Sequence, residues 1–274
     1  MLQYYFLLGV RSLRRNPALT ALMVLILAIG VAASVSTLTI LHVMSGDPIP
    51  QKSERLFAPV VDVNPKEGYV PGQSYSDHQL TYKDAMAFLN SKQGVRRAAM
   101  YGINGVVEPA RKELGVTGLD GIATSVDFFA MFDVPFLYGQ AWREAEDRSA
   151  ADVVVFSRKK AEQLFGAVNP VGQKIRMMNG EYTVVGVIDD WKPSPRFFIY
   201  NGRTAAFASE DEFFVPISNA IRRETPHAGS MSCSGPREPG WQSLLDSECT
   251  WFHFWFEANS APKPTHFTPY LDKN

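Results

Sequence analysis

The sequence is poor in the residues that usually mark catalytic or metal sites. Its 274 residues include two cysteines and five scattered histidines, with no H-E-x-x-H or G-x-S-x-G pattern. Charges nearly cancel, leaving a net charge of −1, so no basic field favours nucleic acid as a partner. We therefore expect a protein that is not an enzyme and that carries no catalytic residue, metal or cofactor.

Long apolar runs are scarce too. Only one segment of the sequence is long enough to cross a bilayer. Residues 18–43 contain no Asp, Glu, Lys or Arg. As a helix they would be about 39 Å long, more than the ~30 Å hydrocarbon core. We predict a transmembrane helix at residues 17–45. A cleaved signal peptide is the alternative, suggested by small residues at 32–36, although its apolar region would exceed the usual length of about 7 to 15 residues.

The residues that flank the apolar segment predict its orientation. Arg11, Arg14 and Arg15 precede it, whereas the residues after it are mixed in charge. The positive-inside rule then places the N-terminus in the cytoplasm and the bulk of the chain outside. Residues 1–16 also mix aromatic and aliphatic side chains with the arginines, as in a cytoplasmic amphipathic segment that lies on membrane lipid.

The remaining chain, residues 46–274, has the patterns of an α+β domain. Apolar residues at helical spacing predict a helix in 80–90. A short helix should begin with Ser125 as its N-cap and stop before Pro135. A buried strand at 153–156 should lead into a helix capped by Ser157.

Residues 164–190 contain two glycines followed by a lysine, which superficially resembles a phosphate-binding loop. Such a loop needs G-x-x-x-x-G-K-[ST] between a strand and a helix, whereas here five residues separate Gly166 from Gly172 and the segment follows a helix. We interpret both glycines as structural turns. The pair Asn179-Gly180 predicts a two-residue hairpin turn, with Gly180 at positive φ.

The two cysteines lie in a segment rich in Gly, Pro and Ser. An even pair outside the cytoplasm can persist as a disulfide, so we predict a bond between Cys233 and Cys249. The alternative is that Cys249 and His253 form a reactive or metal-binding pair. No second histidine or acidic ligand lies at a useful spacing for that alternative.

An aromatic run at residues 250–257 alternates as in a strand. Its even-numbered phenylalanines share one face, and Trp251, His253 and Trp255 share the other. One face should belong to the core. The tryptophan-bearing face is either a candidate partner surface or a surface packed beneath a helix.

Several of these segments together resemble a known family. An N-terminal basic segment, one apolar span and the stretches 128–139, 164–166, 169–175 and 182–190 are similar to the MacB/FtsX-type permeases of ABC transporters, with their MacB-like periplasmic core domain. The family usually has Gly-Arg where this chain has Gly139-Gln140. The resemblance implies Porter-like and Sabre-like subdomains, and we place a Sabre-like insertion at about 119–210.

The resemblance also implies a function. Such permeases are not enzymes; they couple ATP hydrolysis by a cytoplasmic ABC ATPase to movement in the periplasm, and they work with a second permease copy or paralogue. The expected location is the bacterial inner membrane, and the cargo class would be a peptide, lipid, lipoprotein or drug. No second span follows residue 43, so we expect a permease truncated before its second transmembrane helix. The alternative is a membrane-anchored periplasmic binding or sensing domain without transport.

Overall fold

The computed structural model describes residues 4, 14–44, 46–47, 49–62, 76–77, 79–91, 94–109, 115–193, 196–199, 210–233 and 235–259. The chain divides into two compact units, Met1–Asp47 and Pro48–Asn274. Most of the amphipathic segment predicted at 1–16 lies outside the described residues. His78, His266 and the C-terminal residues 260–274 lie outside them as well.

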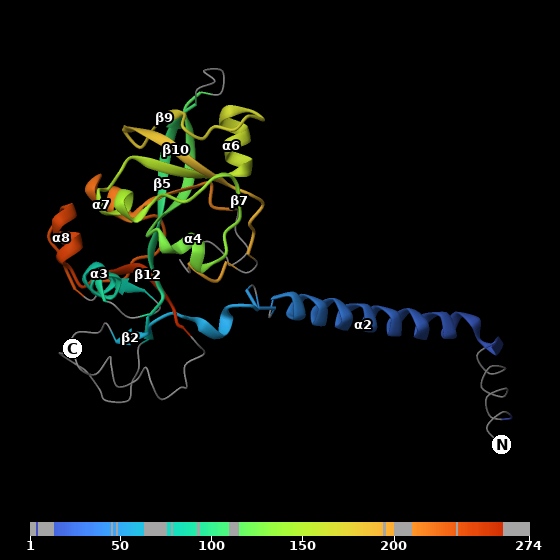
Figure 1. Cartoon of the computed structure of the whole chain (residues 1–274). Helices are drawn as coiled ribbons and strands as arrows, with labels where there is room; N and C mark the ends of the chain where they lie inside the picture. The colour runs from blue at the N-terminus through green and yellow to red at the C-terminus, as the bar shows by residue number, and fades with distance from the viewer. Residues whose placement is uncertain are drawn as a thin grey trace. The chain divides into compact units, whose positions relative to one another are not determined.

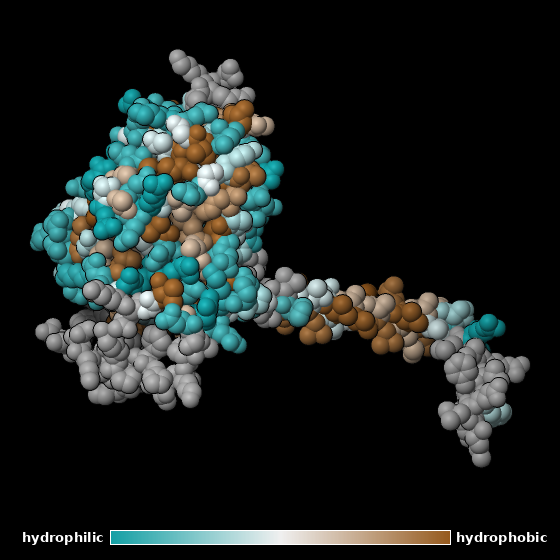
Figure 2. All heavy atoms as spheres, in the orientation of Figure 1, coloured by the Kyte–Doolittle hydropathy of each residue, from teal (hydrophilic) through white to brown (hydrophobic). Residues whose placement is uncertain are grey.

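The first unit contains one long helix, α2 (Pro17–Met44). Within it Pro17–His42 has a mean hydropathy of 2.5, and none of its most apolar window is buried by other parts of the chain. Figure 2 shows this segment as a nearly continuous hydrophobic surface. The hydroxyls of Thr37 and Thr39 donate to carbonyls four residues earlier, so these polar groups are satisfied inside the helix. Length and composition therefore suit a membrane span or a signal sequence.

The second unit contains short helices around a large mixed sheet (Figure 1). Its elements are, in chain order, η1 (Ser53–Arg55), β1 (Leu56–Phe57), β2 (Val61–Asp62), β3 (Ser76–Asp77), β4 (Leu80–Thr81), α3 (Tyr82–Asn90), β5 (Arg96–Glu108), β6 (Thr117–Thr124), α4 (Asp127–Met131), β7 (Phe136–Gly139), α5 (Glu144–Arg148), β8 (Val153–Ser157), α6 (Arg158–Phe165), β9 (Lys174–Met177), β10 (Gly180–Ile188), β11 (Phe213–Pro216), α7 (Ile217–Arg222), α8 (Trp241–Asp246) and β12 (Thr250–Glu257).

Ten strands form one continuous sheet in the order β1-β12-β5-β6-β11-β8-β10-β7, with β4 beside β12. Strand β9 pairs with β10 on one side and with β5 on the other. The six strands β5, β6, β11, β8, β10 and β9 therefore close into a ring. Closure removes the free edges of these strands, which would otherwise be open to pairing with other chains.

Both faces of the sheet are covered, because the strands are apolar on both sides. In β8, Val154 and Phe156 belong to one core, together with residues of α3, α6, α7 and α8. Val153 and Val155 belong to the other core, together with residues of α4. This explains why the sequence of β8 is a continuous apolar run rather than an alternating one.

The predicted helices are present, but one predicted cap is wrong. Helix α6 begins after Ser157, whose side chain accepts a hydrogen bond from the Lys160 N–H, as predicted. Helix α4, in contrast, has no side-chain cap. The Ser125 hydroxyl instead donates to the Arg97 carbonyl and accepts from the Ala99 N–H. Ser125 is therefore used to fasten the start of α4 to β5.

The predicted hairpin is present, but its turn lies one residue earlier than predicted. Met178 and Asn179 have φ values of 47° and 59°, whereas Gly180 begins β10 opposite Met177. This register pairs Tyr182 with Ile175, and both side chains are buried. A shift of one residue would turn β10 over and expose its apolar face, so core packing selects the register.

Candidate functional site

The chain enters and leaves the sheet of the second unit at one place. Strand β1, near the start of the unit, pairs antiparallel with the end of β12, so that Leu56 lies opposite Glu257. The Ala258 N–H donates to the Arg55 carbonyl at 2.8 Å, and the Val95 N–H donates to the Glu257 carbonyl at 2.7 Å. We call this group of residues, Arg55, Leu56, Arg96 and Glu257, the junction.

A buried carboxylate holds the junction together. The side chain of Glu257 is 1% exposed, and its Oε1 accepts from Arg55 at 2.9 Å. Its Oε2 accepts from Arg96 at 2.6 Å. Two guanidinium groups from separate segments thus share one carboxylate. Removing a partner from such a buried arrangement is strongly destabilising, because a charge is left inside without compensation.

The segment between α2 and β1 is fastened by a second set of contacts. Ile49 is 5% exposed and belongs to the core that contains α4. The Lys52 ammonium donates to the Ala130 carbonyl at 2.7 Å and to Asp133 Oδ1 at 2.5 Å. Burial alone would raise the pKa of Asp133, but hydrogen bonds from Lys52 and Gln51 hold it below its usual value. Residues 49–57 are therefore an integral part of the second unit.

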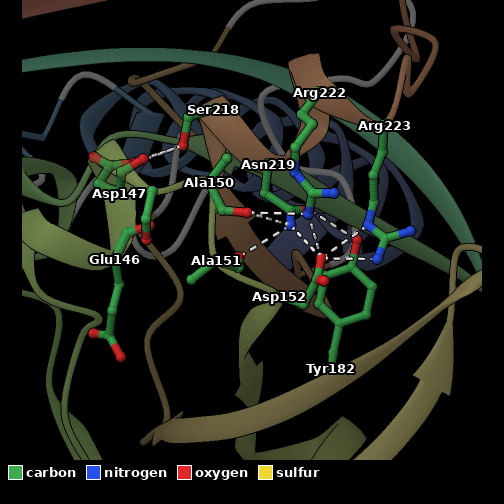
Figure 3. Close-up of polar contacts among 11 residues, drawn as sticks. Glu146, Asp147, Ala150, Ala151, Asp152, Tyr182, Ser218, Asn219, Arg222 and Arg223 are labelled. Atoms are coloured by element: carbon green, nitrogen blue, oxygen red, sulfur yellow. Dashed lines mark hydrogen bonds and ion pairs between the residues drawn. The ribbon is translucent and has the colours of Figure 1, made fainter.

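A polar hub elsewhere in the second unit fastens α7 to the residues that precede β8 (Figure 3). Asn219 has no exposed surface, and its amide donates to the Ala151 carbonyl at 3.0 Å and to Asp152 Oδ1 at 2.6 Å. The Tyr182 hydroxyl donates to Asn219 Oδ1 at 2.8 Å. All hydrogen-bonding atoms of this buried amide are thereby satisfied, which is the condition for a stable buried polar group.

Two arginines complete the hub. Arg222 and Arg223 both donate to Asp152 Oδ1, at 2.7 and 2.9 Å. Burial by itself would raise the pKa of Asp152, but the hydrogen bonds from Asn219 and Arg223 keep it below its usual value. Burial raises the pKa of Tyr182 to about 12, so its hydroxyl stays protonated and can donate.

Asp147 joins α5 to two further elements. Its Oδ2 accepts from the Val126 N–H at 3.0 Å, at the start of α4. The Ser218 hydroxyl of α7 donates to the Asp147 carbonyl. Burial raises the pKa of Asp147 to about 6. Among the described residues no histidine bonds to Ser218, so this Ser–Asp contact lacks the base that a nucleophilic serine requires.

These polar groups fix elements of the second unit to one another. Within the part of the chain that the structure describes, no group of three His, Cys, Asp or Glu side chains is placed to hold a metal ion. The junction and the hub each join segments that are far apart in the sequence.

The structure places the predicted site residues as follows. Cys233 and Cys249 are joined in a disulfide. Gly166 and Gly172 have φ values of 81° and 86°, a left-handed conformation that suits glycine in turns. Gly180 has an extended backbone, so its predicted positive φ is wrong. A Cβ there would lie 2.3 Å from the Arg223 guanidinium, which explains the glycine by close packing.

Of the two interpretations of the tryptophan-bearing face of β12, burial favours packing within the chain over a partner surface. Trp251 is 2% exposed and His253 is 5% exposed. The Trp255 Nε1 donates to the Phe198 carbonyl at 2.9 Å. Residues on both faces of β12 therefore contact its aromatic side chains within the chain.

The sequence analysis missed the junction and the hub. The hub has a local signal, since Arg222 and the C-cap residue Arg223 follow Asn219 by three and four residues and so lie on its side of α7. Asp152 lies immediately before a buried strand. The junction has no local signal, because Arg55 and Arg96 are distant in sequence from Glu257.

Comparisons with known proteins agree on one kind of domain. The family model described as MacB-like periplasmic core domain matches residues 20–238. The chain is 29% identical over 182 residues to the macrolide export ATP-binding/permease protein MacB of Syntrophobacter fumaroxidans, covering 65% of this chain and 25% of that protein. It is 30% identical over 158 residues to the pyoverdine export ATP-binding/permease protein PvdT of Pseudomonas fluorescens, covering 57% and 22%.

The chain thus spans about a quarter of the length of these curated relatives. Among solved structures, the periplasmic region of MacB from Actinobacillus actinomycetemcomitans has a TM-score of 0.49 and 14% sequence identity, with coverage of 84% of this chain and 85% of that one.

Proposed function

Because the chain belongs to the family of the MacB-like periplasmic core domain, we propose that it is the permease subunit, or the N-terminal part of one, of an ABC transporter. In this proposal α2 is an uncleaved anchor in the bacterial inner membrane, and residues 46–274 lie in the periplasm. A cytoplasmic ABC ATPase and a second permease copy or paralogue complete the transporter. The cargo is a peptide, lipid, lipoprotein or drug.

The junction is the observation that carries this proposal. The strand that follows the α2 segment and the strand that precedes the C-terminal residues are hydrogen-bonded neighbours, and Glu257 holds both with buried charge. A pull on either end of the unit is therefore applied at one corner of the sheet. The closed ring of six strands then moves as a stiff body, since its interior is densely packed. Residues 119–210, which include β7 to β10, form the Sabre-like insertion in this proposal.

Co-purification and ATP hydrolysis test the proposal. The complete gene product, in inner-membrane vesicles, should co-purify with the ABC ATPase encoded beside it and should raise its rate of ATP hydrolysis. Replacement Glu257→Ala leaves two guanidinium groups without their carboxylate, and we expect it to reduce this stimulation. The matched control is Glu108→Ala, which removes an exposed carboxylate paired with Arg176 on the surface.

Two results would contradict the proposal. If no ATPase co-purifies and its hydrolysis rate is unchanged by the chain, the protein is better described as a membrane-anchored periplasmic binding or sensing domain. If Glu257→Ala and Glu108→Ala have equal effects on stimulation, the junction has no special part in coupling. Urea unfolding of both variants measures stability separately from coupling. Glu257→Ala should cost about 2 kcal/mol, less than the roughly 3 to 5 kcal/mol for a fully buried pair, because its guanidinium partners reach solvent.

A further inference from the structure

A hollow of about 270 Å³ lies between the turn after α7 and the loop that the disulfide closes. Its apolar lining is provided by Pro226, Trp241 and Leu244. Glu224, His227 and Arg237 provide the polar lining. The hollow is slightly smaller than the ~300 to 1,000 Å³ of drug-binding pockets, so it suits a ligand slightly larger than a single amino-acid side chain. None of these residues belongs to the junction or the hub.

The charges of the hollow are separated rather than paired. Glu224 and Arg237 have opposite charges, yet in the described part of the chain neither forms an ion pair. The Arg237 guanidinium donates to the backbone carbonyls of Glu238 and Gly240, both at the long distance of 3.4 Å. Burial and the nearby Arg237 lower the pKa of His227, which favours its neutral imidazole. One cationic and one anionic group therefore face the same space without neutralising each other.

The walls of the hollow are held in place without a ligand. The Ala228 N–H donates to the Gly102 carbonyl at 2.7 Å, which fixes the turn to β5. On the other side, the Cys233–Cys249 disulfide closes the loop. The Trp241 ring lies 6.0 Å from that of Trp251, and the Trp241 Nε1 is buried without a hydrogen-bond partner among the described residues. A backbone that is already fixed loses little entropy when a ligand binds, and the exposed side chains of Glu224 and Arg237 become ordered on binding.

We propose that this hollow binds a zwitterion with an apolar body, of the class of free apolar α-amino acids. Arg237 takes the carboxylate and Glu224 takes the ammonium group, while Pro226, Trp241 and Leu244 contact the apolar side chain. Charge-assisted hydrogen bonds supply orientation, and the apolar contacts supply much of the affinity. This site is independent of ATP-driven transport, so it goes beyond the function proposed above.

Three probes with the same phenyl body test the proposal on the full chain in detergent micelles. L-phenylalanine carries both charges, 3-phenylpropionate carries the carboxylate alone, and phenethylamine carries the ammonium alone. The chain is labelled with ¹⁵N-tryptophan, and the Trp241 indole signal is identified by its loss in Trp241→Phe. We expect L-phenylalanine to shift this signal with a lower Kd than either single-charge probe.

Charge removal should change the three affinities selectively. Arg237→Gln should weaken L-phenylalanine and 3-phenylpropionate by about tenfold, the loss of one charge-assisted hydrogen bond, and leave phenethylamine unchanged. Glu224→Gln should weaken L-phenylalanine and phenethylamine and leave 3-phenylpropionate unchanged. The matched controls, Arg176→Gln and Glu238→Gln, should bind all three probes as the unchanged chain does.

The proposal is overturned if L-phenylalanine at about 10 mM, a concentration at which even millimolar ligands bind, leaves the Trp241 signal in place. It is also overturned if Arg237→Gln and Glu224→Gln weaken all three probes equally, which would indicate an apolar pocket without charge recognition. Unchanged positions of the other tryptophan indole signals in each variant show that the variant is folded, so a loss of binding is then assigned to the hollow.

Discussion

At the scale of single residues, Asp147 shows how burial makes a carboxyl group sensitive to pH. Its carboxylate accepts a hydrogen bond from the Val126 N–H, and its backbone carbonyl accepts one from the Ser218 hydroxyl. Asp127 and Glu144 add negative charge nearby. Burial is the main cause that raises its pKa from 3.8 to about 6. The ionised form is therefore disfavoured in the folded protein, although its hydrogen bonds partly compensate.

The raised pKa predicts how stability changes with pH. Between about pH 4 and pH 6 the folded chain keeps a proton on Asp147 that the unfolded chain has released, so unfolding becomes easier as pH rises through this window. We expect this group to lower the unfolding free energy by on the order of 1 to 2 kcal/mol from pH 4 to pH 7. In Asp147→Asn that part of the pH dependence should be absent.

Urea unfolding at a series of pH values measures the difference between the two proteins. Burial also raises the pKa of Asp211 to about 6, even though Arg196 pairs with it, so Asp211 titrates in the same window. Asp211 is present in both proteins, so its effect cancels in the comparison. Parallel stability curves for the unchanged chain and Asp147→Asn would show that Asp147 is ionised normally.

At the scale of elements, the β9–β10 hairpin shows how packing chooses a turn. Asn-Gly is a strong hairpin signal in sequence, yet the turn uses Met178 and Asn179. Gly180 belongs to β10, where the absence of a side chain leaves room for Arg223 in the hub. The same glycine thus satisfies a requirement of tertiary packing rather than one of backbone conformation.

Substitutions at two adjacent positions separate the cost of backbone conformation from the cost of close packing. Asn179 has a φ of 59°, so Asn179→Val should cost about 1 to 2 kcal/mol of unfolding free energy, whereas Asn179→Gly should be nearly neutral. Gly180→Ala should be milder than Asn179→Val, because the end of the flexible Arg223 side chain can move. Thermal unfolding of the three variants provides the measurement. A larger loss for Gly180→Ala would show that the Arg223 side chain cannot move aside for a methyl group.

At the scale of the whole molecule, the proposed function predicts how the chain is oriented in the membrane. If α2 is an uncleaved anchor, a tag placed before Met1 should stay on the mature protein. A cysteine introduced at the exposed residue Arg143 should react with a membrane-impermeant maleimide in intact spheroplasts. A cysteine introduced at Arg14 should react after the membrane is permeabilised. The native cysteines are joined to each other, so they do not compete for the reagent.

Loss of the tag during export would identify α2 as a signal sequence. Protection of position 143 in intact spheroplasts would reverse the predicted orientation. Either result would be independent of the fold of the second unit, whose two cores are formed within Pro48–Asn274.

The sequence by itself determined the features that depend on local chemistry. Uninterrupted apolar composition specified the long helix α2, and hydrophobic periodicity with capping residues specified α3, α6 and the strands around them. The cysteine pair and the turn glycines Gly166 and Gly172 were also readable, because each needs only its own neighbours or a single partner of its kind. The α+β class and the family resemblance follow from the order of these segments.

Tertiary structure alone decided which segments meet. It paired β1 with β12, brought Arg55 and Arg96 to Glu257, closed the ring through β9, and moved the hairpin turn to Met178 and Asn179. It also buried Trp251 and His253, which the strand pattern had left open to a partner. The physical reason is that burial and charge pairing depend on distances between residues far apart in the chain, and local sequence patterns contain no record of those distances.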